Sequence, residues 1–116
     1  MDVFRNRPTV IFLRMRHSTG LRSTILSSAS ISLDGKVHDP NRIDFLARYL
    51  KQVKRAASEI DLRGYFEWTL LDNFEWNKGY AERFGLVYVD FETQKRIWKD
   101  SAYWYADVVK ENGANL

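Results

Sequence analysis

The chain has 116 residues, 45% of them hydrophobic, which is enough for one small globular domain. It has no cysteine, so the sequence excludes disulfide bridges, thiolate metal sites and a cysteine nucleophile. The net charge of +3 arises in residues 1–36, where no basic helix or zinc-finger spacing accompanies it, so we expect no nucleic-acid partner. A nucleic-acid binder that uses residues 1–36 stays open as an alternative function. Salt-dependent retention of the chain on heparin would reveal it.

The sequence contains no run of eighteen apolar residues and no apolar core near its N-terminus. A membrane-spanning helix needs about eighteen or more such residues, and a secretory signal needs an apolar stretch after its basic start. We therefore expect no membrane partner and a cytoplasmic location.

The first expected element is a short strand at residues 7–12, Arg-Pro-Thr-Val-Ile-Phe, which is β-branched and aromatic. Residues 1–12 are thus a strand-like start. Residues 13–33 follow without helical or strand periodicity and are rich in serine, arginine and threonine. This pattern is typical of a loop or an irregular segment.

A helix is expected to begin at Asp39-Pro40, because aspartate is a favoured N-cap and proline fits the first helical position. Its apolar residues recur every three or four positions, which predicts one buried face. They are Ile43, Leu46, Leu50, Val53, Ala57 and Ile60. Residues 61–64 should close this helix.

The segment 65–71, Tyr-Phe-Glu-Trp-Thr-Leu-Leu, predicts an aromatic strand, and strand, helix and strand together favour a parallel β/α unit. A long loop at 72–85 comes next. Residues 86–91 and 96–98 predict a hairpin with its turn at 92–95. A last helix should run from about residue 99 to residue 111 and end at Asn112-Gly113.

Aromatic, acidic and amide side chains gather at the end of the second expected strand and in the loop after it. They are Trp68, Asp72, Asn73, Glu75, Trp76, Lys78 and Tyr80. Tryptophan faces stack on pyranose rings, while carboxylates and indole N–H groups bond sugar hydroxyls, so the mixture suits a neutral carbohydrate. The residues alone leave a second interpretation open, in which the tryptophans fill a core and the acids face water.

Two runs of sequence carry a family resemblance. They are GYFEWTLLDNFEWNKGYAERFGLVYVDFETQKRIWKDSAYWY at 64–105 and DGKVHDPNRIDFLARYLKQVKRA at 34–56. Both resemble the C-terminal part of glycoside hydrolase family 1. The resemblance implies an α/β fold, the eight-stranded β/α barrel, with its site at the C-terminal ends of the strands. By this resemblance the chain is an incomplete barrel that supplies the last two strands, helices and a terminal hairpin, and residues 34–116 are the C-terminal part of that barrel.

The resemblance also implies roles for four residues. Glu75 would accept hydrogen bonds from two hydroxyls of the non-reducing sugar, and Trp76 would donate its indole N–H to a third. Trp68 would be the stacking floor, Phe84 would line the same subsite, and the bond from Trp68 to Thr69 is expected to be cis. We expect Asp72 and Asn73 to shape the loop through local backbone contacts.

The remaining polar residues receive no role in the chemistry. Glu67, Lys78 and Glu82 are expected to be solvated or paired outside the subsite. His17 and His38 look too isolated for a metal site or a catalytic pair. We expect neither a metal nor a cofactor.

The catalytic carboxyl groups of the family are missing. Retaining glycosidases use two of them about 5 Å apart, as nucleophile and as acid/base. The Asn-Glu-Pro motif of the acid/base is absent here, and Leu13-Arg14-Met15-Arg16 stands where a motif like Ile-Thr-Glu-Asn-Gly is expected. We therefore assign no catalytic residue.

A shifted reading frame is one hypothesis for this loss. One allowed set of codons for residues 12–19, read one base out of phase, gives Ser-Glu-Asn-Ala-Ala-Phe-Asn, which is close to the nucleophile motif. Residues 13–33 would then be frame-shifted, with family-like sequence resuming near Asp34. The nucleotide sequence tests this hypothesis. If no alternative reading frame through residues 13–33 encodes the nucleophile motif, the hypothesis is wrong.

By resemblance, the function is that of a β-glucosidase-type retaining hydrolase for terminal β-linked sugars, in a chain expected to be inactive alone. The alternative is a non-catalytic carbohydrate-binding remnant. The expected partners are a small-molecule β-glycoside or monosaccharide and the missing N-terminal barrel portion. Two barrel strands leave exposed edges, so we expect poor stability without that portion.

Overall fold

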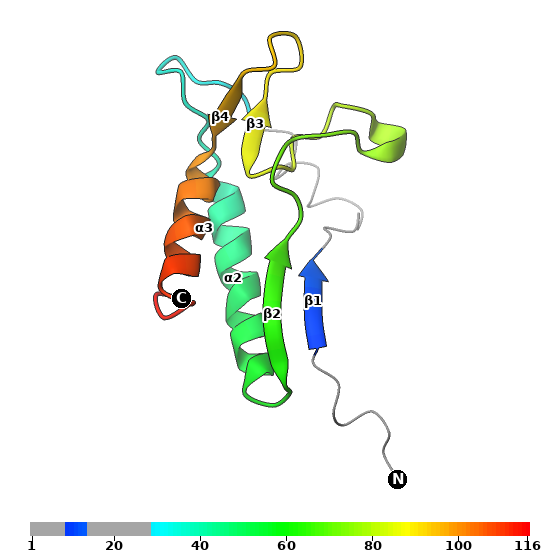
Figure 1. Cartoon of the computed structure of the whole chain (residues 1–116). Coiled ribbons are helices and arrows are strands. Elements are labelled where there is room, and N and C mark those ends of the chain that lie inside the picture. The colour runs from blue at the N-terminus through cyan, green and yellow to red at the C-terminus, as the bar shows by residue number, and fades with distance from the viewer. Residues whose placement is uncertain (1–8, 14–28) are drawn as a thin grey trace.

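The computed structural model describes the backbone of residues 9–13 and all of residues 29–116 (Figure 1). Most of the expected irregular segment 13–33 therefore lies outside the described residues, as does the start of the first expected strand. The elements are β1 (Thr9–Leu13), α2 (Pro40–Ala57), β2 (Leu62–Glu67), the 3-10 helix η1 (Trp76–Lys78), β3 (Val87–Val89), β4 (Arg96–Trp98) and α3 (Asp100–Lys110).

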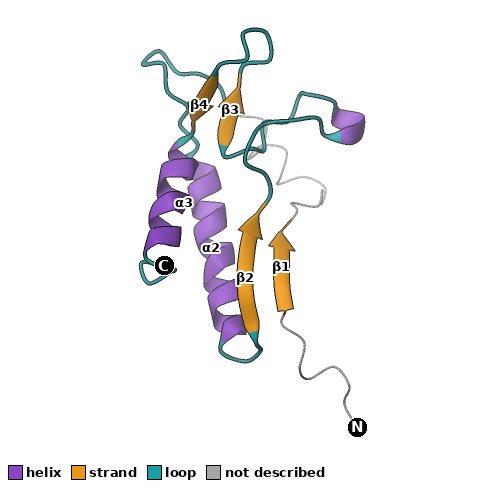
Figure 2. Ribbon diagram, viewed as in Figure 1, coloured by secondary structure: helices purple, strands orange, loops and turns teal. Residues whose placement is uncertain are grey.

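β1, α2 and β2 form a parallel unit, as the order of elements predicted. The two strands pair in parallel, with Val10 opposite Gly64 and Leu13 opposite Glu67. Helix α2 comes between the two strands in the sequence, and α3 packs beside α2 (Figure 2). Because the strands are parallel, both C-terminal ends lie at the same edge of the sheet.

The second strand begins and ends earlier than the sequence indicated. We expected residues 65–71, whereas β2 is Leu62–Glu67. Its partner β1 ends at Leu13, opposite Glu67, so the ladder stops there. The chain beyond pairs with the hairpin instead: Val87 N donates to the carbonyl of Leu70 (2.8 Å), and Leu71 forms a parallel bridge with Val87.

Helix α2 begins at Pro40 as expected, but the carboxylate of Asp39 does not cap it. That carboxylate instead accepts hydrogen bonds from the backbone N (2.8 Å) and hydroxyl (2.5 Å) of Ser101 at the start of α3. Asp39 therefore stabilises the N-terminus of the other helix, where an acidic group is favoured by the exposed N–H groups. Asp39 thus occupies the predicted N-cap position of α2, but its carboxylate bonds Ser101 of α3 and not the backbone of α2.

The buried stripe of α2 follows the predicted spacing in its first half only. Leu46 and Leu50 are buried, but α2 ends at Ala57, and both Ala57 and Ile60 are exposed. The stripe continues in the other direction to Arg42, which is 2% exposed. The core that results contains Leu46, Leu86 and Ala102.

The hairpin and the last helix agree with the sequence prediction. β3 and β4 pair antiparallel, with Tyr88 opposite Ile97. α3 ends before Asn112 and Gly113, both at positive φ, and Gly113 N donates to the carbonyl of Val108 (2.8 Å). No helix among the described residues is long and apolar enough to span a membrane.

His38 is not isolated, contrary to the sequence interpretation. Its Nδ1 lies 2.7 Å from Asp100 Oδ2, and its Nε2 lies 3.0 Å from Asp34 Oδ2. Hydrogen bonds to Asp100 and then to Asp34 raise the pKa of His38. The protonated imidazole thus joins the start of α3 to the segment before α2.

This contact predicts a pH dependence of stability. A raised pKa in the folded chain means that the contribution is complete below the unfolded pKa of about 6.5 and is lost as pH rises through the folded pKa. We expect the urea midpoint to fall as pH is raised from about 6 to about 8, and His38→Gln to reduce that fall. Equal pH dependence in both proteins would contradict the assignment.

Candidate functional site

All four residues to which the sequence assigned a sugar contact lie on one segment, residues 68–85, which follows β2 (Figure 1). Trp68 comes directly after the last residue of β2. Glu75 and Trp76 lie at the start of η1, and Phe84 lies near the return to β3. The peptide bond between Trp68 and Thr69 is cis, as expected.

If the tryptophans filled a core and the acids faced water, the indoles would be buried and the carboxylates exposed. The structure shows the reverse. Trp68 and Trp76 are 48% and 68% exposed, while Asp72 and Glu75 are only 3% and 8% exposed. Exposed indoles beside buried carboxylates are typical of a binding surface, because a core buries aromatic rings and leaves acids in water. The core interpretation of the two tryptophans is therefore wrong for this structure.

Glu75 and Trp76 form a tight turn. The backbone N of Glu75 donates to the carbonyl of Gly79 (2.7 Å), and Lys78 N donates to the carbonyl of Glu75 (2.8 Å). Trp76 has φ +43°, in the left-handed region that large side chains rarely adopt. Such conformations are maintained by surrounding structure and cluster at functional sites.

Phe84 is placed differently from the two tryptophans. It is 5% exposed and packs against Phe45 of α2. The structure thus gives Phe84 a packing role at the base of the segment, and its contact with a sugar stays a prediction.

Asp72 shapes the loop, but through long-range contacts. Its Oδ1 accepts from Gly85 N (2.8 Å) and its Oδ2 from Val89 N (3.4 Å). We expected both residues to bond nearby backbone N–H groups, but the N–H groups that Asp72 bonds are distant in sequence, and the side-chain amide of Asn73 donates to the nearby carbonyl of Leu71 (3.2 Å). The carboxylate of Asp72 therefore closes the loop 72–85 at its base.

Two buried cations lie beneath this loop, and the sequence interpretation gave neither a role. Lys99 Nζ lies 2.9 Å from Asp72 Oδ1, and both side chains are fully buried. Arg42 Nη2 lies 3.4 Å from Glu67 Oε1, at side-chain exposures of 2% and 1%. Arg42 could have been recognised, because it lies four residues before Leu46 on the buried stripe of α2.

Glu67 is the centre of the second buried group. Tyr65 donates its hydroxyl to Glu67 Oε2 (2.5 Å), and burial raises the pKa of the Glu67 carboxyl. Burial followed by the adjacent Glu67 charge raises the pKa of Tyr65 as well. Glu67 is thus paired outside the subsite, one of the alternatives that we expected.

Glu82 departs from the expectation of a solvated or paired residue. It is 7% exposed, and its Oε2 is buried without a hydrogen-bond partner in the described part of the chain. Within residues 29–116, no group of histidine, aspartate and glutamate side chains is arranged to hold a metal ion.

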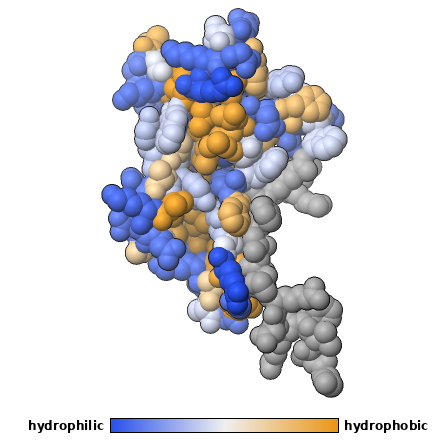
Figure 3. Space-filling model, viewed as in Figure 1, coloured by the Kyte–Doolittle hydropathy of each residue, from blue (hydrophilic) through white to orange (hydrophobic). Residues whose placement is uncertain are grey.

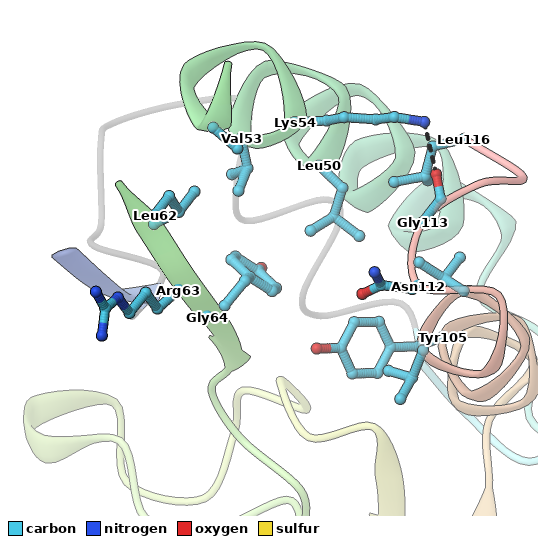
Figure 4. Close-up of a pocket in the computed structure, with 14 residues that line it drawn as sticks. Leu50, Val53, Lys54, Leu62, Arg63, Gly64, Tyr105, Asn112, Gly113 and Leu116 are labelled. Carbon is cyan, nitrogen blue, oxygen red and sulfur yellow. Dashed lines mark hydrogen bonds between the residues drawn. The ribbon is translucent and has the colours of Figure 1, made fainter. Parts of the chain in front are cut away.

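The described chain also has a cavity of about 460 Å³ between α2, β2 and α3 (Figure 4). Leu50, Leu62, Tyr65, Tyr105 and Val108 are among its lining residues. It lies at the helix layer and contains none of the four predicted sugar ligands. The cavity is therefore separate from the candidate site.

Comparison with known proteins decides the family. The model of the group described as "Glycosyl hydrolase family 1" matches residues 24–114, which is most of the chain. The chain belongs to glycosyl hydrolase family 1. The match begins inside the segment 13–33 that we expected to be irregular, upstream of Asp34, and the segment boundaries stay predictions.

Similar family 1 proteins include a glucohydrolase and a β-glucosidase. The chain is 61% identical over 84 residues to the 1,4-beta-D-glucan glucohydrolase of Thermotoga neapolitana and to beta-glucosidase A of Thermotoga maritima. The solved structure of the Thermotoga maritima β-glucosidase in complex with glucoimidazole matches 74% of the chain with a TM-score of 0.72 and 59% identity.

The chain corresponds to only a small part of these relatives. The matched region is 72% of this chain but 19% of each Thermotoga protein, and 20% of the solved structure. The activities named for those proteins belong to chains about five times the matched length. The structure described here is consistent with part of a family 1 barrel.

Proposed function

We propose that this chain carries the part of a β-glucosidase site that holds the terminal, non-reducing sugar. Glu75 accepts hydrogen bonds from sugar hydroxyls, the indole N–H of Trp76 donates to another hydroxyl, and the face of Trp68 stacks on the pyranose ring. Phe84 supports the same subsite from below. The similarity to family 1 glucosidases supports a glucoside as the ligand.

The observation that carries the proposal is the pairing of exposed indoles with buried acids on residues 68–85. Trp68 and Trp76 are 48% and 68% exposed, whereas Glu75 is held at 8% exposure in a hydrogen-bonded turn. A fixed carboxylate near exposed aromatic faces is suited to a polar ligand with apolar faces, such as a pyranose.

The position of the segment also supports the proposal. β1 and β2 correspond, in this proposal, to the seventh and eighth strands of the family barrel. Residues 68–85 then follow the C-terminal end of the last strand, and barrel enzymes keep their chemistry at that end of the strands. The other strands would come from an N-terminal barrel portion, the protein partner we propose.

The chain alone is proposed to bind a sugar without hydrolysing it. After β1 the sequence reads Leu13-Arg14-Met15-Arg16, without the glutamate that would form a glycosyl-enzyme. A carbohydrate-binding remnant is thus the form in which this chain acts by itself. The remaining strands could supply the acid/base carboxyl group, whereas the place of the nucleophile follows β1 in this chain and holds no glutamate.

A glucose titration and a hydrolysis assay test the proposal together. We expect a saturable change in tryptophan fluorescence at millimolar glucose, weakened by Glu75→Gln, and no turnover of an aryl β-glucoside above buffer. Asn77→Asp is the matched control, because Asn77 is exposed in the same turn. Absence of any glucose effect, or a clear hydrolysis rate abolished by Glu75→Gln, would refute the proposal.

A further inference from the structure

The ammonium group of Lys99 contacts the loop of the proposed subsite at two distant points. Nζ donates to Oδ1 of Asp72 (2.9 Å) and to the carbonyl of Arg83 (2.7 Å). Asp72 begins the loop 72–85 and Arg83 lies near its end. One buried cation, located just before α3, therefore joins the two sides of the loop at its base.

We propose that Lys99 is a positioning residue for the sugar subsite: it holds the loop 72–85 closed and so keeps Glu75 where sugar hydroxyls can reach it. This inference rests on the proposed function, because it assumes that Glu75 contacts the sugar. Lys99 itself lies beneath the loop and touches no ligand.

The contacts of Asp72 explain why the loop depends on this cation. The same Oδ1 that receives Lys99 also accepts from Gly85 N (2.8 Å). The nearest other cation, Arg83 Nη1, is 3.8 Å from Asp72 Oδ2. Without Lys99 the buried carboxylate would lose its closest counter-charge, and hydrating it requires the base of the loop to open.

Arg83 fixes the outer side of the same loop. Its Nη1 donates to the carbonyl of Val89 (2.6 Å), and its guanidinium carbon lies 4.2 Å from the Phe91 ring centroid and 4.6 Å from that of Tyr88. These contacts join the loop to the hairpin, and Arg83 Nη1 approaches the loop's first residue, Asp72, only to 3.8 Å. Lys99 Nζ, at 2.9 Å, makes the closer contact with Asp72 and also bonds the carbonyl of Arg83.

Charged groups from two parts of the chain surround Lys99. Asp72 and Arg83 face it from the loop, and Arg42 and Asp39 lie at the start of α2. Burial lowers the pKa of Lys99 to about 8, even though Asp72 acts in the opposite direction. Burial lowers this pKa only while the loop is closed, so the opened loop would bind the proton more tightly, and raising the pH through about 8 should favour the closed loop.

The test compares Lys99→Met and Lys99→Arg with Lys95→Met, an exposed control on the hairpin turn. Glucose affinity is measured by fluorescence, and amide hydrogen exchange of Gly85 is measured by NMR with Leu50 of α2 as reference. Lys99→Met should weaken glucose binding about tenfold, since a small displacement of a ligand group costs at least that much. It should also speed exchange at Gly85 more than at Leu50, while Lys95→Met changes neither.

The pH profile separates positioning from general support of the fold. Glucose affinity and the protection of Gly85, corrected for intrinsic exchange, should rise in the wild type as pH rises past about 8, and Lys99→Arg should flatten both profiles. If Lys99→Met does not fold, this comparison decides the question. Unchanged Gly85 exchange in Lys99→Met, equal acceleration at Leu50, or identical wild-type and Lys99→Arg profiles overturns the proposal.

A failure of the proposed function would be recognised separately. If the wild-type chain does not respond to glucose at any pH, the sugar assignment is wrong, and Gly85 exchange alone then decides whether Lys99 closes the loop. If Lys99→Met loses both glucose binding and the protection of the Gly85 amide, the result supports both the sugar assignment and the role of Lys99.

Discussion

Gly85→Ala is expected to destabilise the chain by about 3 kcal/mol, the upper range for inserting a methyl group where none fits. A Cβ at Gly85 would lie 2.2 Å from Asp72 N and 2.3 Å from the carbonyl carbon of Leu71. Both are backbone atoms at the base of the loop, so no side chain can move aside. The loop should separate from the strand end, and glucose binding should disappear with it.

The measurement is the free energy of unfolding in urea, followed by circular dichroism, together with the glucose titration. Gly64→Ala is the matched control, because the contact of its new Cβ with the described residues is to the side chain of Phe66, at 3.2 Å, and not to backbone. A side-chain contact at this distance is far milder than the backbone contacts at Gly85, so the control should change stability by less than about 1 kcal/mol. Equal stability of the two variants would contradict the close approach at Gly85.

Arg42→Met is expected to remove about 3–5 kcal/mol of stability, the usual effect of leaving one member of a buried ion pair alone. Glu67 would remain 1% exposed, and among residues 29–116 its carboxylate would keep the hydroxyl of Tyr65 as a partner. Because an unpaired buried carboxyl takes up a proton more readily, the loss should shrink as pH falls below about 5. Urea unfolding at neutral and acidic pH measures both effects.

Two comparisons identify the cause of that loss. Arg48→Met removes an arginine that pairs with Asp44 on the exposed side of α2 and should cost less than about 1 kcal/mol. Adding Glu67→Gln to Arg42→Met should recover most of the stability, because a neutral amide can still bond the Tyr65 hydroxyl. A double variant no more stable than Arg42→Met would show that the lost packing of Arg42, and not the unpaired charge, is responsible.

Local patterns were sufficient to predict where most elements lie. Proline at position 40, the alternation at 86–91 and Asn112-Gly113 each act through neighbouring residues, and the corresponding helix, hairpin and helix end are found there. The limits of β2 were misplaced because they depend on β1, which ends opposite Glu67. Strand length is set by the partner as much as by the strand's own residues.

Residues that act across long sequence separations were the ones missed. Asp39 and Ser101, Asp72 and Lys99, and Arg42 and Glu67 are 62, 27 and 25 residues apart. Periodicity shows which face of a helix is buried but does not show which charge meets which. Resemblance to the family predicted sugar contacts for Trp68, Glu75 and Trp76, whereas the pairing of Lys99 with Asp72 and of Arg42 with Glu67 emerged from the folded contacts.

Aromatic side chains of the loop 72–85 pack against the hairpin. On the face shown in Figure 3, hydrophobic residues gather on the upper part of the molecule. Phe74 and Tyr80 of the loop and Phe91 of the hairpin turn are in edge contact, with ring centroids 5.6 Å and 4.7 Å apart. These contacts hold the outer side of the loop, while Asp72 and Lys99 hold its base.

The central claim is that Trp68, Glu75 and Trp76 hold one pyranose, and NMR of the ¹⁵N-labelled chain during a glucose titration tests it most directly. The four indole N–H signals can be followed one by one. We predict saturable shifts for Trp76 and Trp68, none for Trp98 and Trp104, and loss of the Trp76 shift in Glu75→Gln. Glucose that leaves Trp76 and Trp68 unchanged, or shifts all four indoles alike, would contradict the account.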